Sequence, residues 1–315
     1  MNSPHRKKIS IVVPVYNEEL SIPTFYQQLK QVLSSIAYDT EVLFVNDAST
    51  DGSQAILEGI SASDPTVKVI EFVRNFGKEI ATTAGINQCI GDVCIMLDAD
   101  LQHPPEQIPD FIKKWEEGAE VVVGIRRVNK GEDFVKRIGS FWFYKIINAI
   151  GYVKLIPYTT DFRLIDREVI DTFNTLSEKN RITRGLIDWM GFRSAYVYFD
   201  ANVRASGSAS YSTIKLFRLA FASIVSLSLF PLRLAGYLGL IITLFSGLLG
   251  LVVVVFKYVY PTAWGLSITG SATLAIIIVF LVGIILICLG LIALYIANIH
   301  SEVINRPMYI VRKKR

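Results

Sequence analysis

Two long uncharged runs near the C-terminus constrain the fold more than any other feature of the chain. Residues 234–256 carry no charged side chain over 23 positions, and residues 272–297 carry none over 26. A helix of about 20 apolar residues crosses the core of a lipid bilayer, and runs this long exceed what a buried core needs. The sequence therefore predicts a two-helix transmembrane region over residues 232–305, preceded by a separate domain over residues 1–212.

Basic side chains gather on one side of the predicted spans. The connection between the two uncharged runs offers only Lys257, whereas basic residues flank the outer ends of both runs. Cytoplasmic flanks carry the excess of Lys and Arg, so the N-terminal domain and the basic tail at 306–315 are both expected in the cytoplasm. This describes a multi-pass protein of the inner (plasma) membrane. The flanking residues are Lys215, Arg218, Arg233, Arg306, Arg312, Lys313, Lys314 and Arg315.

The N-terminal domain alternates between two patterns. Five apolar, β-branched runs ("KISIVVPV", "EVLFVND", "VKVIEFV", "DVCIMLD" and "AEVVVGI") are separated by stretches of helical periodicity. Nearly continuous apolar strands are typical of a sheet covered on both faces, and strand–helix alternation predicts an α/β domain with a mostly parallel sheet. The chain lacks GxGxxG and GxxxxGK[ST], so a dinucleotide oxidoreductase and a P-loop NTPase lose their main support. Its three cysteines lack zinc-site spacing.

Polar clusters follow each predicted strand in turn. They read "YNEE", "NDASTDGS", "RNFGK", "DADLQH" and "RR". Ligands bind at the carboxyl ends of strands in open α/β sheets. Any one cluster could be an ordinary turn, but five in succession, several of them acidic, favour a binding site at this edge.

The fourth cluster holds two carboxylates one residue apart. Asp98 and Asp100 leave a predicted strand at alternate positions, so their side chains point the same way and repel unless a cation lies beside them. Oxygen ligands with open positions suit Mg²⁺ or Mn²⁺, which take further oxygens from substrate phosphates. The alternative is a capped turn, with Asp100 accepting backbone N–H groups before a helix near Pro104. His103 is either a further ligand or a structural hydrogen-bonding residue.

Residues 213–231 combine helical periodicity with a basic edge at Lys215 and Arg218. This pattern predicts an amphipathic helix lying in the membrane surface with its basic edge toward anionic headgroups. The alternative is a helix packed on the soluble domain.

Together the motifs resemble a known family. "PVYNEE", "VNDASTDGS", "NFGK", "DADLQHPPE" and "TTDFRLIDREV" are similar to the family 2 glycosyltransferases of GT-A fold, a Rossmann-like α/β class. Within that family they resemble the polyprenyl-phosphate sugar transferases, which act on dolichyl or undecaprenyl phosphate. The resemblance covers residues 9–233 in order, and the two-helix tail matches the bacterial, bactoprenol glucosyltransferase branch.

The resemblance implies roles for individual residues. A divalent metal would be held by Asp100 and Gln102, with Asp98 beside them, and Asp161, Asp100 and Arg204 would be the catalytic residues. In place of the family's R-x-x-G-x-S-K-Y stretch the chain reads "RASGSASY", so Ala209 and Ser210 stand where Ser-Lys is expected. The nucleotide-sugar donor would be bound by Pro14, Tyr16, Glu18, Asp47, Asp98, Ala99, Asp100, Arg126 and Arg204.

The expected activity is an inverting, metal-dependent transfer of a sugar from a nucleotide-sugar, glucose from UDP-glucose being the best match, onto undecaprenyl phosphate. Transfer of mannose or aminoarabinose, a processive polysaccharide synthase and a non-enzymatic membrane scaffold are the alternatives. Small residues along the spans and the related enzymes predict a homo-oligomer, a tetramer by resemblance, although packing of the two spans within one chain explains the same residues. No nucleic-acid partner is expected. The acceptor phosphate would be bound by Arg126, Arg127, Lys136, Arg137, Lys215 and Arg218.

Overall fold

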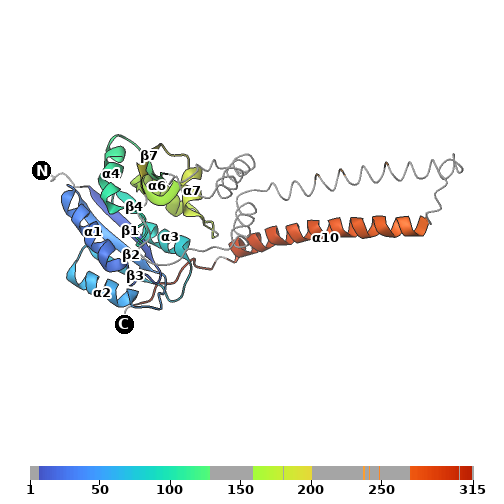
Figure 1. The fold of residues 1–315 in the computed structure, drawn as a ribbon, viewed down its shortest axis with the longest axis horizontal. Helices are drawn as coiled ribbons and strands as arrows, with labels where there is room; N and C mark the ends of the chain where they lie inside the picture. The colour runs from blue at the N-terminus through green and yellow to red at the C-terminus, as the bar shows by residue number, and fades with distance from the viewer. Residues whose placement is uncertain are drawn as a thin grey trace. The chain divides into compact units, whose positions relative to one another are not determined.

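A computed structural model describes residues 7–127, 159–179, 181–200, 270–304 and 306–313, together with the single positions 237, 241 and 248. These residues fall into two units (Figure 1). One contains a seven-stranded sheet, its helices and the C-terminal residues 306–313. The other contains helix α10, Gly270–Val303.

The sheet of the first unit has the strand order β3-β2-β1-β4-β6-β5-β7. Strand β6 runs antiparallel to both of its neighbours, and the other pairings between the seven described strands are parallel. The predicted α/β domain with a mostly parallel sheet is therefore confirmed, as a mixed sheet. The strands are β1 (Lys8–Val15), β2 (Asp39–Asn46), β3 (Val67–Glu71), β4 (Val93–Met96), β5 (Val121–Arg126), β6 (Thr159–Asp166) and β7 (Ser194–Phe199).

Helices cover both faces of this sheet, because apolar side chains of the strands alternate between two cores. Along β1, Ile9, Ile11 and Val13 belong to one core and Val12 to the other, and all four are fully buried. The first core includes side chains of α1 (Ile22–Ser35), α2 (Ser53–Ser63) and α4 (Ile108–Glu116). The second includes side chains of α3 (Lys78–Gln88), α6 (Arg167–Thr175) and α7 (Thr183–Trp189).

The strand directions bring the predicted polar clusters to one edge. Strands β1, β2, β3 and β4 are parallel, so their carboxyl ends lie at the same edge of the sheet. Strand β6 pairs antiparallel with β4, so its first residues lie at that edge too. Asp161, near the start of β6, thereby comes close to Asp98, which follows β4.

The C-terminal residues pair with the outer strand of the sheet. Val311 forms an antiparallel bridge with Phe72, the Val73 N–H donates to the Ile310 carbonyl, and the Tyr309 ring stacks on Phe72 at 5.2 Å between centroids. Arg312 adds an ion pair with Glu71 at 2.8 Å. This short addition covers the exposed edge of β3 near its carboxyl end, where an unpaired strand would otherwise present open N–H and C=O groups.

Helix α10 is 34 residues long and carries exposed apolar side chains, among them Ile287 (66% exposed) and Leu289 (54%). Side chains are described for only part of it, and over the described residues no helix combines the length and apolarity of a membrane span. The two predicted spans are therefore not confirmed. The predicted interfacial helix at 213–231 lies outside the described residues.

We expect Gly85→Ala to destabilise the domain. A Cβ atom at Gly85, on α3, would stand 2.2 Å from Cγ1 of the fully buried Val12, so helix or strand must shift. Overpacking of this kind costs about 1–3 kcal/mol. Gly59→Ala on α2 is the matched control, because nothing lies within 4 Å of its added Cβ and helical Gly→Ala stabilises by about 0.5–1 kcal/mol. Thermal unfolding in detergent should show opposite shifts of Tm, and equal shifts would contradict the helix–sheet packing.

Candidate functional site

An open cavity of about 220 Å³ lies at the carboxyl edge of the sheet. It is built from the ends of β1, β2 and β4 and from the start of α3. Seven of the nine residues predicted to bind a nucleotide-sugar line it, although they come from three separate segments of the chain. The lining residues are Pro14, Val15, Tyr16, Glu18, Asp47, Asn75, Gly77, Lys78, Ala81, Asp98, Ala99 and Asp100.

Other predicted site residues lie elsewhere. Arg126 is exposed at the end of β5 and is not among the described lining residues. Arg127 is exposed and pairs with Asp200 at 3.4 Å. Gln102 is also absent from the described lining, and its backbone N–H donates to Asp100 Oδ1 at 3.0 Å. The remaining predicted residues, Lys136, Arg137, Arg204, Ala209, Ser210, Lys215 and Arg218, lie outside the described residues.

Hydrogen bonds tie the loop after β1 to the loop after β2. The Asn17 N–H donates to Ser49 Oγ at 3.0 Å, and Asn17 Oδ1 accepts from the Thr50 N–H at 2.8 Å. Glu19 Oε2 accepts from the Gly52 N–H at 2.7 Å. These reciprocal contacts hold one wall of the cavity in place before any ligand binds.

Backbone strain gathers at the same edge. Three non-glycine residues have positive φ among the described residues: Asn17 (56°), Ala48 (56°) and Leu101 (62°). Each follows the end of a strand that contributes to the cavity, β1, β2 and β4 respectively. Such conformations cost about 1–3 kcal/mol each and persist where the surroundings over-determine them, as they do in binding sites.

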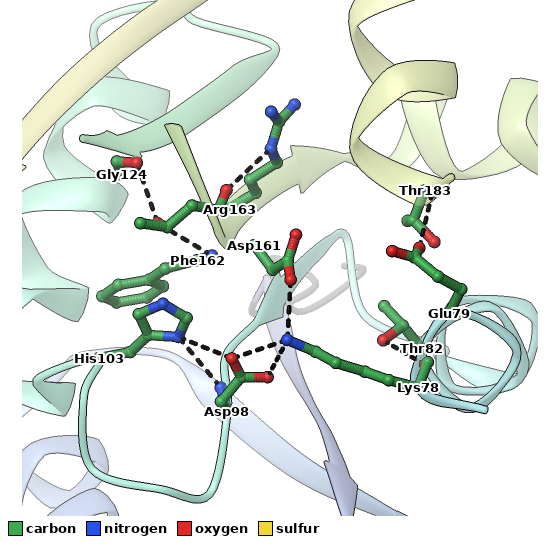
Figure 2. A network of polar contacts seen from close by, with 11 residues as sticks. Lys78, Glu79, Thr82, Asp98, His103, Gly124, Asp161, Phe162, Arg163 and Thr183 are labelled. Carbon is green, nitrogen blue, oxygen red and sulfur yellow. Dashed lines mark hydrogen bonds and ion pairs between the residues drawn. The ribbon is translucent and has the colours of Figure 1, made fainter. Parts of the chain in front are cut away.

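Lys78 is the centre of the polar contacts, and the sequence had assigned it no role. Its Nζ lies 2.7 Å from Asp98 Oδ1, 2.8 Å from Asp98 Oδ2 and 2.7 Å from Asp161 Oδ2 (Figure 2). The lysine comes from the first turn of α3, and the two carboxylates come from neighbouring strands. The "RNFGK" cluster after the third strand was the signal that could have identified it.

The carboxylates also change the acid–base properties of this group. Burial by itself would lower the pKa of Lys78, but the charges of Asp98 and Asp161 outweigh it and hold the pKa above its ordinary value. Burial likewise raises the pKa of Asp161, whereas the neighbouring charge of Lys78 brings it below its ordinary value. Near neutral pH Lys78 is therefore an ammonium and Asp161 a carboxylate.

Asp47 positions the turn that carries Lys78. Its side chain is buried, and its two oxygens accept the backbone N–H groups of Phe76 at 2.6 Å and Gly77 at 2.8 Å. Gly77 has a φ of +99°, which an L side chain rarely adopts, so glycine is required where the turn enters α3. Burial raises the pKa of Asp47, and the two N–H bonds partly offset that effect.

His103 packs as a structural residue. It is buried against the rings of Phe162 and Phe199, and its Nδ1 accepts the Asp98 backbone N–H at 3.3 Å. Burial lowers the pKa of His103 even though the charge of Asp98 opposes this shift, so the ring is neutral near pH 7. Of the two roles open to it, the contacts favour structural hydrogen bonding over metal ligation.

The donor chemistry of the cavity fits a hard divalent cation. The described lining residues include four carboxyl groups, those of Glu18, Asp47, Asp98 and Asp100, and one ammonium, that of Lys78. An anionic diphosphate would be repelled from such a surface unless further positive charge entered with it. Asp100 also accepts one backbone N–H, so part of the capped-turn alternative holds. The described residues contain no ready-made cluster of three or more metal-ligating side chains.

The family follows from comparison with known proteins. The model of glycosyl transferase family 2 matches residues 10–173, more than half of the chain. The chain belongs to this family. It is 42% identical over 304 residues to an uncharacterized glycosyltransferase, YkcC, of Bacillus subtilis, covering 96% of this chain and 93% of that protein.

A second relative has a more specific name. The SfII prophage-derived bactoprenol glucosyl transferase of Shigella flexneri is 39% identical over 306 residues, covering 97% of this chain and 98% of that protein. One similar solved structure is a glucosyl-3-phosphoglycerate synthase from Mycobacterium tuberculosis, in complex with Mn²⁺, UDP-glucose and phosphoglyceric acid. Its TM-score is 0.46 at 18% sequence identity, and the match covers 70% of this chain and 78% of that chain.

We expect Asp47→Ala to lower stability more than Asp47→Asn. The alanine variant removes the acceptors of two backbone N–H groups, and the asparagine variant keeps one acceptor oxygen. Each buried donor left unsatisfied costs about 1–3 kcal/mol. Thermal unfolding of the two variants measures the difference. Wild-type stability in both would show that Asp47 does not hold the turn.

Proposed function

We propose that this protein transfers glucose from UDP-glucose to undecaprenyl (bactoprenol) phosphate at the cytoplasmic face of the membrane, with inversion at the anomeric carbon. The observation that carries the proposal is the cavity at the carboxyl edge of the sheet, which Asp98, Asp100 and Lys78 line. Lys78 also pairs with Asp161 in the smaller cavity beside it. The names and near-complete coverage of the relatives support the choice of sugar and acceptor.

The proposed reaction needs little acid–base help from the protein. A phosphate oxygen of the acceptor attacks C1 of glucose, the bond from C1 to the β-phosphate oxygen breaks, and UDP leaves with the electron pair. The acceptor phosphate is already largely ionised near neutral pH, so Asp161 need not be a general base and instead orients the reacting groups. Mg²⁺ or Mn²⁺ held by Asp100 and Gln102, with Asp98 beside them, would stabilise the charge growing on the diphosphate.

The membrane part of the proposal rests on the sequence and on α10. A lipid-linked acceptor is met most easily by an enzyme anchored beside it, and the uncharged runs and the exposed apolar side chains of α10 support such an anchor. We further propose an amphipathic helix at 213–231 on the membrane surface, and Arg126, Arg127, Lys136 and Arg137 as candidates for binding the acceptor phosphate. A homo-oligomer, which crosslinking in native membranes would detect, stays a prediction.

We expect purified protein to convert radiolabelled UDP-glucose and undecaprenyl phosphate into a lipid-linked monosaccharide. Asp100→Ala should lower the rate by at least about a hundredfold, because the diphosphate charge then goes unbalanced, and EDTA should do the same to the unaltered protein. Asp110→Ala, an exposed aspartate in the first turn of α4, is the control. Full activity in EDTA, with no response to added metal, would show that the reaction needs no divalent cation. A polymeric product would indicate a processive synthase.

A separate test addresses the acceptor. Replacing both Lys215 and Arg218 by Ala should raise the KM for undecaprenyl phosphate in liposomes and leave the KM for UDP-glucose nearly unchanged. Each basic group near an anionic surface contributes about 1 kcal/mol of attraction, and binding lost equally from ground and transition states appears in KM alone. The opposite pattern, weaker UDP-glucose binding with an unchanged lipid KM, would show that this segment is not the entry surface for the acceptor.

A further inference from the structure

We propose that Lys78 binds the diphosphate of the nucleotide-sugar through its ammonium group. In the ligand-free protein this ammonium pairs with two carboxylates, and a divalent cation competes for them once the nucleotide binds. This inference deepens the proposed function and rests on it. It assigns a role to a residue that the sequence motifs leave without one.

The position of Lys78 favours this role. It lines the cavity that contains Pro14, Tyr16 and Asp100, and it also lines a second, smaller cavity next to it that contains Asp161 and Arg184. The ammonium therefore stands between the space expected to hold the nucleotide and the carboxylate expected near the reacting sugar (Figure 2). The diphosphate of the donor joins these two parts of the substrate.

The charge of the Lys78 ammonium can serve ligand binding as well as stability. It is the one cationic side chain among the described lining residues of the larger cavity. Its side chain is 45% exposed, and those of Asp98 and Asp161 are 22% and 34% exposed. Ion pairs with this much solvent access add little net stability, so the ammonium can exchange Asp98 for another anion at a small cost in free energy.

The geometry also explains how Lys78 could change partners. Its Nζ contacts both oxygens of Asp98 but one oxygen of Asp161. A divalent cation brought in with the nucleotide would compete with the ammonium for Asp98, since two cations at one carboxylate repel each other. Lys78 can keep Asp161 and turn toward a diphosphate oxygen, because its long, flexible stem allows the head group to move. The turn at Gly77 that Asp47 holds keeps the base of the stem in place.

This exchange makes a prediction that a structural ion pair does not make. In Lys78→Met, Mn²⁺ alone should bind more tightly than in the wild type, by about fivefold or more, because its competitor for Asp98 is gone. UDP at saturating Mn²⁺ should bind more weakly, by about tenfold or more, because a charge-assisted hydrogen bond to phosphate is lost. Lys78→Arg keeps the charge, and both dissociation constants should stay near their wild-type values.

The experiment uses the full-length protein in detergent. Electron paramagnetic resonance of free Mn²⁺ gives the Kd for the metal alone, and isothermal titration with UDP at saturating Mn²⁺ gives the Kd for the nucleotide. Lys68→Met is the matched control, since Lys68 pairs with Glu41 at 3.0 Å, and neither residue is among the described lining of the cavity. Lys78→Gln, which can still donate to a carboxylate, repeats the test should the methionine variant fail to fold.

The outcomes separate this inference from the proposed function. Opposite shifts of the two dissociation constants in Lys78→Met, with none in Lys68→Met, support the exchange. Shifts in the same direction, or none, overturn it and leave the proposed function standing. A raised KM for undecaprenyl phosphate with unchanged UDP binding also overturns it, because Lys78 would then serve the acceptor. A wild type that binds no UDP with any divalent cation overturns both.

Discussion

The contact of one ammonium with two carboxylates is the interaction on which the rest of the site depends. Strands β4 and β6 are antiparallel neighbours, so Asp98 at the end of one and Asp161 at the start of the other come together at the edge of the sheet. Two such charges in a partly enclosed cavity repel unless a cation lies between them. Lys78 supplies that cation from the first turn of α3, and Asp47 at the end of β2 fixes this turn. Four elements of the fold thereby meet at a single positive charge.

The surroundings of this contact keep the cavity in shape without a ligand. The loops after β1 and β2 are joined by hydrogen bonds, and the strained residues Asn17, Ala48 and Leu101 lie at the same edge. A rigid cavity with an acidic lining is a poor site for a free anion but a suitable one for an anion accompanied by a divalent cation. The same acidic character that argues against unaided nucleotide binding therefore argues for the metal dependence that we propose.

Much of this fold and part of its site could be predicted from the sequence, because both depend on local patterns. The apolar runs of β1, β2 and β4 indicated a sheet buried on both faces, and the polar residues that follow them, Tyr16, Asp47 and Asp100 among them, line one cavity. The "RNFGK" cluster placed Lys78 at this edge, but its partners could not be predicted, since they are 20 and 83 residues away and meet it only through the strand order. Periodicity also could not show that both oxygens of Asp47 are engaged by backbone N–H groups, or that Tyr309 stacks on Phe72.

The central claim is that the cavity at the carboxyl edge of the sheet binds a nucleoside diphosphate together with a divalent cation. A crystal structure of the protein with UDP and Mn²⁺, with data collected at the manganese absorption edge, tests it directly. We predict an anomalous peak beside Asp100 in contact with diphosphate oxygens, with the nucleotide along the wall formed by Pro14 and Tyr16 and with Lys78 turned from Asp98 toward the diphosphate. UDP bound outside this cavity, or bound inside it with no anomalous peak near Asp100, would contradict the claim.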